Sequence, residues 1–297
     1  MRRSALAPAK VNLFLHVGPL DVEEGRHPVS SLMVFANVGD RVTIEPADHP
    51  EFVLDGPMSA QLLNSSAEDN LVIRARDLIL ERLRRPVAPF RLTLIKSLPV
   101  ASGLGGGSSD AGAALALIRD ALDLPLDDMD LQGLAARLGS DGPACFRARP
   151  VLASGWGDEL GPAPQMPTLH AVLVNPGVPC STAAVYAAFD RQDREPDVTP
   201  PPMPEQLESL EEVAAWLSFT RNDLEAPAER VCPEITEVLA TLRDERETLL
   251  ARVSGSGATC FALCAGDYEA QTLLERINDL RPDWWARVCR LGGPWTG

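Results

Sequence analysis

Apolar and polar residues alternate along some segments of the first half of the chain and recur every three or four positions along others. Alternation is typical of strands and the longer spacing of amphipathic helices. These patterns predict strands at 9–17 and 90–95 and helices at 71–83, 111–122 and 128–138. Two apolar runs within 32–45, joined at 37–40 (Asn-Val-Gly-Asp), predict a hairpin. Side chains in 65–70 offer caps for the first helix.

The second half of the chain continues the mixture after a boundary rich in Pro and Gly at 161–164. The patterns predict strands at 169–174, up to 253 and at 258–264, helices at 205–217, 234–248 and 267–279, and an exposed loop at 195–204. We expect two domains, 1–163 and 164–297. Short alternating strands mixed with amphipathic helices indicate the α+β fold class.

The charge and the cysteines restrict the function classes. A formal net charge of -15 repels phosphate backbones and anionic lipids, so we expect neither nucleic acid nor a membrane surface as a partner. The sequence has no run of about 18 apolar residues that would predict a membrane span. The six cysteines form no Cys-x-x-Cys pair, which gives no support for a metal site and suits reduced thiols in the cytoplasm.

Lysine is rare in this chain. Of 27 basic residues only two, Lys10 and Lys96, are lysines. One lies in the first predicted strand and the other just before a glycine-rich segment. A chain that otherwise uses arginine keeps lysine where a compact, rotatable ammonium is needed, although chance placement also accounts for two residues.

The glycine-rich segment is the strongest chemical signal. Residues 103–110 (Gly-Leu-Gly-Gly-Gly-Ser-Ser-Asp) precede a predicted helix. Glycines let an anion approach the backbone N–H groups, and a helix N-terminus adds unpaired donors and partial positive charge. The alternative is a plain strand-to-helix turn capped by Ser109. Walker and dinucleotide loops do not fit, because Ala113 replaces the Walker lysine and Ser108 the third dinucleotide glycine.

Two further segments carry polar groups that suit catalysis. Lys10 and Asn12 share one face of an apolar strand, so Lys10 either meets an anion in a cleft or extends to solvent from an edge strand. Asp141 lies between a helix end and a Pro-containing turn, where spacing alone favours a turn residue. The Gly/Ser segment 254–257 suits a hairpin turn as well as a site loop.

Residues 99–113 (Pro-Val-Ala-Ser-Gly-Leu-Gly-Gly-Gly-Ser-Ser-Asp-Ala-Gly-Ala) resemble the phosphate loop of the galactokinase–homoserine kinase–mevalonate kinase superfamily. The triple glycine with Ser-Ser-Asp-Ala, the segment 7–13 and the Gly-x-Asp-x-Pro around Asp141 resemble its diphosphocytidyl-methylerythritol kinase branch. The resemblance implies a two-domain α+β kinase that uses ATP and Mg²⁺, with an active site in the cleft between an N-terminal ATP-binding domain and a C-terminal substrate-side domain. It also implies that the 254–257 loop packs against the phosphate loop.

The same resemblance implies roles for particular residues. Asp141 is the expected catalytic base and Lys10 its partner. The expected ATP contacts are Lys96, Pro99, Gly103, Leu104, Gly105, Gly106, Gly107, Ser108 and Ser109, and the expected substrate contacts are Asn12, Arg26, His27, Thr182 and Tyr186. No residue is expected to bind a metal ion directly.

Substrate recognition is where the sequence departs from that branch. Arg26 stands where an aromatic residue is usual, and the segments 147–149 and 155–159 also differ. A kinase for another alcohol, such as homoserine or mevalonate, and a nucleotide-binding protein without catalysis are the rival hypotheses. We expect phosphorylation of the 2-hydroxyl of diphosphocytidyl-methylerythritol in isoprenoid precursor synthesis, by a monomer or weak homodimer.

Overall fold

The fold was analysed in a computed structural model that describes residues 2–63, 66, 69–83, 86–192, 196–199 and 202–295. Within these residues the strands form one mixed sheet, whose main path runs β3-β4-β2-β10-β7-β9-β8. The strands are β1 (Arg3–Val17), β2 (Val29–Pro46), β3 (Glu51–Asp55), β4 (Phe90–Ile95), β5 (Val151–Ser154), β6 (Glu159–Pro162), β7 (Leu169–Asn175), β8 (Thr248–Val253), β9 (Cys260–Cys264) and β10 (Trp285–Gly292). β1 and β5 both pair with β2, and β6 pairs with β5.

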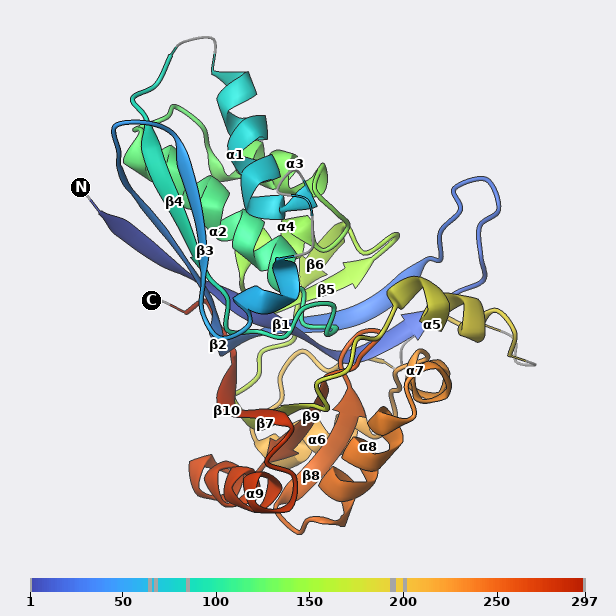
Figure 1. Cartoon of the computed structure of the whole chain (residues 1–297). Coiled ribbons are helices and arrows are strands. Elements are labelled where there is room, and N and C mark those ends of the chain that lie inside the picture. Colours follow the sequence, from blue (N-terminus) through green and yellow to red (C-terminus); the bar gives the residue numbers. More distant parts are fainter. Residues whose placement is uncertain are drawn as a thin grey trace.

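The helices form two groups, one on each half of the sheet (Figure 1). The upper group in that view is η1 (Ser59–Leu62), α1 (Leu71–Arg82), α2 (Gly106–Ala121), α3 (Asp128–Ala136) and α4 (Gly142–Arg147). The remaining helices are α5 (Thr182–Phe189), α6 (Leu210–Leu217), α7 (Glu225–Val231), α8 (Glu234–Asp244) and α9 (Asp267–Leu280). None of the described helices is long and apolar enough to cross a bilayer.

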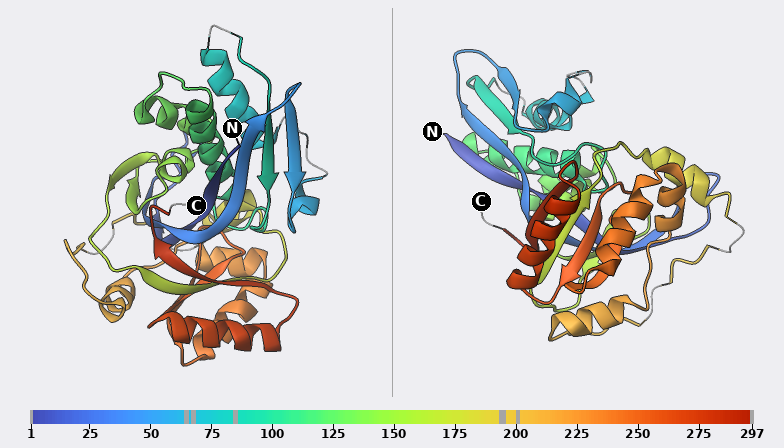
Figure 2. Two further views of the ribbon diagram at one scale, coloured as in Figure 1. Left: turned by 90° about the vertical axis from the view of Figure 1, so that its left-hand side faces the viewer. Right: turned by 60° about the horizontal axis from the view of Figure 1, so that its bottom comes forward.

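The long strands β1 and β2 cross the junction between the two helix groups (Figures 1 and 2). A core made mainly of leucines, alanines and isoleucines lies between α1, α2, α3 and strands β1, β2 and β4, and a second core packs α7, α8 and α9 against β7, β8 and β9. Since one sheet passes through both halves, residues on β1 can contact loops of either half. The division at 163/164 stays a prediction.

The predicted hairpin at 37–40 is wrong, because β2 runs unbroken through these residues. Two features explain the polar interruption. Gly39 lies against β1, where a Cβ would sit 2.1 Å from the carbonyl oxygen of Ala7. Asp40 is fully buried, and its Oδ1 accepts the N–H groups of Ser97 and Leu98. A close backbone approach and a buried anchor, rather than a turn, account for this polar segment.

The glycine-rich segment is helical over most of its length. α2 begins at Gly106 rather than at residue 111, so the last two glycines, Ser108, Ser109 and Asp110 form its first turns. Glycine has low helix propensity, and the sequence pattern therefore predicted a loop there. The remaining predicted strands and helices are present with shifted ends, while Ser65, Ala67 and Glu68 of the expected capping segment lie outside the described residues. The sequence patterns did not anticipate η1, α4, α5, α7, β3, β5, β6 or β10.

Candidate active site

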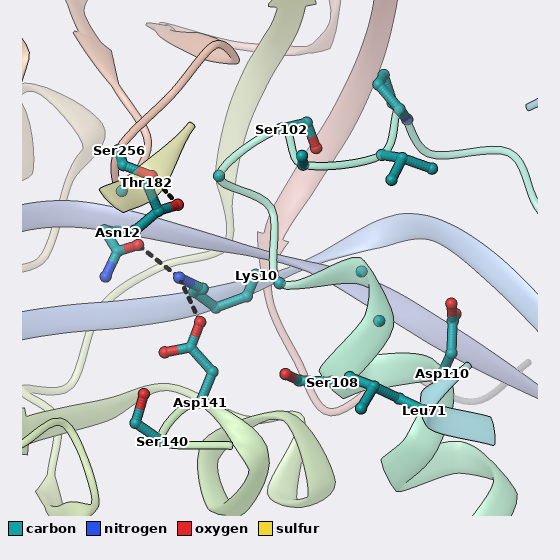
Figure 3. Close-up of a pocket in the computed structure, with 18 of the residues that line it drawn as sticks. Lys10, Asn12, Leu71, Ser102, Ser108, Asp110, Ser140, Asp141, Thr182 and Ser256 are labelled. Atoms are coloured by element: carbon teal, nitrogen blue, oxygen red, sulfur yellow. Dashed lines mark hydrogen bonds and ion pairs between the residues drawn. The ribbon is translucent and has the colours of Figure 1, made fainter. Parts of the chain in front are cut away.

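A cavity of about 480 Å³ lies where the two halves meet. Its wall includes residues 99–103 and 105–108 of the glycine-rich segment, the middle and end of β1, the turn before α4 and the first two turns of α5. Figure 3 shows this arrangement, with Lys10 near the centre and Ser108 on the first turn of α2. The volume falls within the range typical of small-molecule sites.

The N-terminus of α2 points unpaired donors at the cavity. Gly105 is the N-cap residue, with a left-handed backbone (φ 62°) and no side chain to cap the helix. Among the described residues, the N–H groups of Gly106, Gly107 and Ser108 have no protein acceptor, whereas the N–H of Ser109 bonds to Gly105 O. Together with the helix dipole, three free N–H groups form a site suited to phosphate oxygens.

The second half of the chain holds this loop in place. Ser254 Oγ donates to Gly103 O over 3.0 Å, and the N–H of Thr259 donates to Ser102 O over 3.1 Å. Gly103 has φ 76°, and a Cβ there would lie 2.2 Å from Ser254 O. The 254–257 turn therefore packs directly on the phosphate loop, and Gly103 permits this contact.

Lys10 and Asp141 form an ion pair at the cavity wall. Lys10 Nζ lies 3.1 Å from Asp141 Oδ2 and donates to Asn12 Oδ1 over 2.8 Å (Figure 3). The Lys10 side chain is only 6% exposed, so its ammonium depends on these two partners. Asn12 is fixed in turn, because its Nδ2 donates to Ser31 Oγ over 2.8 Å. The alternation of β1 places both polar side chains on the cavity face.

Asp141 is positioned by α4, which the sequence did not reveal. It is the N-cap residue of this helix, but its side chain makes no capping bond. Pro143 near the helix start lacks an N–H that a cap would satisfy. One carboxylate oxygen thus pairs with Lys10, and Oδ1 has no partner among the described residues. With the side chain about one-third exposed (32%), Oδ1 is accessible from the cavity.

Lys96 lies behind the phosphate loop. Its Nζ contacts Asp40 Oδ2 and donates to Asp110 Oδ2 over 2.9 Å, and its side chain is 4% exposed. Burial works against the charged ammonium, but the two carboxylates together raise the pKa of Lys96. Both lysines of the chain are therefore buried, ion-paired and next to the cavity.

Helix α5 contributes Thr182 and Tyr186 to the cavity wall. Thr182 Oγ1 shares a 2.8 Å hydrogen bond with Ser256 Oγ. Burial, followed by the nearby charge of Asp141, raises the pKa of Tyr186 to about 12, so its phenol stays neutral. Its ring packs against His27 in a tilted arrangement, with ring centres 5.1 Å apart. The site thus offers a neutral aromatic group within reach of the Lys10–Asp141 pair.

Four expected contact residues do not line the cavity: Arg26, His27, Leu104 and Ser109. Arg26 lies in an exposed turn, and Leu104 and Ser109 are buried. His27 supports Tyr186 from behind, because its Nδ1 is 2.9 Å from Gly18 O and its Nε2 is 3.3 Å from Asp190. In this geometry both ring nitrogens already have protein partners.

Other cavity residues had not been singled out as contacts. They include Asp69, Asn70, Asp110, Ser140, Trp156 and Ser256. Trp156 lies on the turn between β5 and β6, within a segment that the sequence showed to depart from the family pattern. That departure was the one available signal for it.

The sequence matches two models of one kinase family. The family model described as "GHMP kinases N terminal domain" matches residues 70–148, and "GHMP kinases C terminal" matches residues 203–282. A Caulobacter vibrioides protein named 4-diphosphocytidyl-2-C-methyl-D-erythritol kinase is 61% identical over 292 residues, which are 98% of this chain and 100% of that protein.

Solved structures agree with this match. A crystal structure of 4-(cytidine 5'-diphospho)-2C-methyl-D-erythritol kinase has a TM-score of 0.78 at 33% identity and covers 99% of this chain and 100% of its own. Homoserine kinase from Cytophaga hutchinsonii has a TM-score of 0.69 at 20% identity, with 98% and 94% coverage. The second likeness concerns the fold alone.

The α+β fold, the glycine-rich helix N-terminus and the two matched family models define an ATP-dependent small-molecule kinase of the GHMP class. The predicted fold class is therefore confirmed. At 61% identity over nearly its whole length, the chain belongs to the 4-diphosphocytidyl-2-C-methyl-D-erythritol kinase family, as the sequence motifs had indicated.

Proposed function

We propose that this chain transfers the γ-phosphate of ATP to the 2-hydroxyl of 4-diphosphocytidyl-2-C-methyl-D-erythritol, in the non-mevalonate route to isoprenoid precursors. The observation that carries the proposal is the Lys10–Asp141 pair, whose partners lie 3.1 Å apart on the wall of the cavity that also receives the N-terminus of α2. The names of the relatives supply the substrate.

In this proposal the phosphates of ATP bind the free N–H groups of Gly106, Gly107 and Ser108. Asp141 Oδ1 accepts the proton of the attacking hydroxyl, and the hydroxyl oxygen forms a bond to the γ-phosphorus as the bond to ADP breaks. Lys10 fixes the Asp141 carboxylate and stabilises the negative charge that develops on the hydroxyl oxygen. Phosphoryl transfer depends mainly on such positioning and charge stabilisation.

Mg²⁺ is proposed on the phosphate oxygens, completed by water, because Mg²⁺ usually keeps several waters in nucleotide sites. It would neutralise phosphate charge there. Among the described residues, no group of three or more His, Cys, Asp or Glu side chains could hold a metal ion. The three free N–H groups at α2 and the ammonium of Lys10 suit phosphates that carry such an ion.

The direct test is ADP release with three candidate acceptors: the diphosphocytidyl alcohol, homoserine and mevalonate. We expect ADP to form in equal amount to a phosphorylated diphosphocytidyl product, with at most background release for the other two. Equal turnover of a non-cytidylated alcohol would contradict the substrate assignment. Absence of ADP formation with any alcohol would favour the non-catalytic alternative.

Replacing Tyr186 with Ala should raise KM for the diphosphocytidyl substrate by about 5- to 150-fold, because base–aromatic stacking contributes about 1–3 kcal/mol. KM for ATP should change little. The matched control is Tyr268→Ala, since Tyr268 is the other tyrosine of the chain and is 78% exposed. Steady-state kinetics with both substrates varied would measure this, and an unchanged KM for the diphosphocytidyl substrate would remove Tyr186 from the base site.

The proposal extends to the setting of the enzyme. All six cysteines are free and buried, which suits a reducing cytoplasm. Residues 1–163 would act as the ATP-binding part and 164–297 as the substrate-side part. Arg26 and His27 would contribute to base binding only if the 18–28 segment moved toward the cavity. A monomeric or weakly dimeric state stays a prediction.

A further inference from the structure

Three buried ionisable groups meet directly beneath the phosphate loop. Lys96 Nζ is the shared partner of one carboxylate oxygen of Asp40 and one of Asp110. These groups come from three elements, because Asp40 belongs to β2, Lys96 follows β4 and Asp110 lies in the second turn of α2. All three side chains are at most 4% exposed. The proposed mechanism assigns no chemical step to them.

The two carboxylates are not equivalent. Asp40 Oδ1 accepts two backbone N–H groups, from Ser97 at 2.5 Å and Leu98 at 2.8 Å. Asp110 Oδ1 is buried and has no hydrogen-bond partner in the described part of the chain. With both carboxylates ionised, the cluster would carry one uncompensated negative charge in the interior, which is costly. A proton on Asp110 removes that charge.

The pKa of Asp110 agrees with this charge count. Burial raises it most, the ammonium of Lys96 lowers it, and the charge and hydrogen bonding of Asp40 raise it again, so that it reaches about 8. At pH 7 the cluster therefore holds an extra proton, which it loses as the pH rises above about 8.

The cluster is placed to respond to a bound anion. A Cβ on Gly106, the first residue of α2, would lie 3.0 Å from Lys96 Nζ, and both Lys96 and Asp110 contribute to the cavity wall. The other titratable groups around Asp110 and the phosphate loop are Cys145 of α4, Lys10 of β1 and Asp141. Burial raises the pKa of Cys145 to about 12, and Lys10 is paired with Asp141. Asp110 is thus the group here that titrates near pH 8.

We propose that the Lys96–Asp40–Asp110 cluster is a positioning site that, at mildly alkaline pH, takes up a proton when nucleotide phosphates bind to the N-terminus of α2. The phosphates bring several negative charges close to Asp110 and exclude water, and both effects favour its neutral form. When Asp110 is neutral, Asp40 is the one charged carboxylate that contacts Lys96 within the cluster. Asp110 still accepts the hydrogen bond from Lys96, which connects α2 to β2 and to the end of β4. The inference rests on the proposed ATP site but not on the identity of the alcohol.

The first test is calorimetric titration of the wild-type protein with ADP at pH 8, in two buffers of different ionisation enthalpy. If the phosphates raise the pKa of Asp110 from about 8 by roughly one unit, binding takes up about 0.4 of a proton. ADP affinity should also fall roughly five- to tenfold from pH 7 to pH 9.5, since one unit corresponds to a factor of ten. The terminal phosphate of free ADP is already deprotonated over most of this range.

The second test replaces Asp110 with Asn, which has the same shape as the protonated acid and cannot titrate. D110N should bind ADP within a few-fold of wild type at pH 7, without the proton uptake and without the loss of affinity above pH 8. The matched control is Asp120→Asn, an exposed position on the same helix, which should keep both wild-type properties. A purely structural role for Asp110 would alter affinity at every pH alike.

Two results would overturn the inference. One is wild-type binding of ADP with no buffer-dependent enthalpy at pH 8, which is informative even if D110N fails to fold. The other is proton uptake by D110N equal to that of wild type. Failure to bind ADP at any pH would instead contradict the proposed ATP site.

Discussion

An Asp141→Asn variant is expected to turn over about 10²- to 10⁴-fold more slowly than wild type, the usual contribution of a positioned general base. The amide cannot accept the hydroxyl proton through a carboxylate oxygen. It still reaches Lys10, because its Oδ1 can occupy the place of the carboxylate oxygen that lies 3.1 Å from Nζ. The KM values for both substrates should therefore stay within a few-fold of wild type.

Steady-state kcat, measured with both substrates saturating, checks this prediction. Asp279→Asn is the matched control, since Asp279 is exposed near the end of α9. Lys10→Met keeps the apolar stem of the lysine and should also lower kcat. The double variant should lose much less than the product of the two single losses, because the pair acts as a unit. If D141N turned over at nearly the wild-type rate, Asp141 would not be the general base and would have only a structural role at the start of α4.

The polar positions within β1 show how far the sequence leads toward the site. Lys10 and Asn12 are two residues apart on an apolar strand, and alternation alone places them on one face. Their rarity in that context indicated an anion or a cleft, and the structure gives Lys10 an anionic partner, Asp141. The partner itself is 131 positions away in sequence, and no local pattern links the two. The family resemblance, not the spacing, supplied it.

Asp40 illustrates why other parts of the fold and the site could not be predicted from the sequence. Next to Gly39 it has the composition of a turn, and the sequence analysis therefore predicted a hairpin there. The carboxylate of Asp40 instead binds Lys96 and the two backbone N–H groups that follow it, 56 to 58 positions away in the sequence. Local patterns report on neighbours within a few residues, whereas a buried ion cluster is a long-range product of the completed sheet.

The contacts of His27 were equally out of reach of local patterns. The family resemblance implied that His27 contacts the substrate, and that role stays a prediction. The folded chain uses both ring nitrogens, one with Gly18 O and one with Asp190, and lays the ring against Tyr186. Base recognition would then depend on the ring of Tyr186, which His27 supports on the side away from the cavity. Trp156 adds another aromatic side chain to the cavity wall, and it lies in a segment where this chain departs from the family pattern.

A Gly105→Val variant is expected to lose nucleotide affinity by at least about 100-fold while keeping its fold. Gly105 has φ 62°, a left-handed conformation that a β-branched residue adopts only with strain of about 1–3 kcal/mol. Its Cβ would also lie 3.1 Å from Lys10 Cε and 3.3 Å from Cys145 Sγ. The added side chain would therefore press on Lys10. Relieving this contact and the backbone strain would turn the N–H groups of Gly106 and Gly107 away from the phosphates.

Calorimetric titration with ADP measures the loss of affinity, and the melting temperature reports on the fold. Gly133→Val is the matched control, because Gly133 is exposed in α3 and a Cβ there would meet nothing within 4 Å. Wild-type ADP affinity in the Gly105→Val variant would mean that nucleotide phosphates bind elsewhere than at the N-terminus of α2.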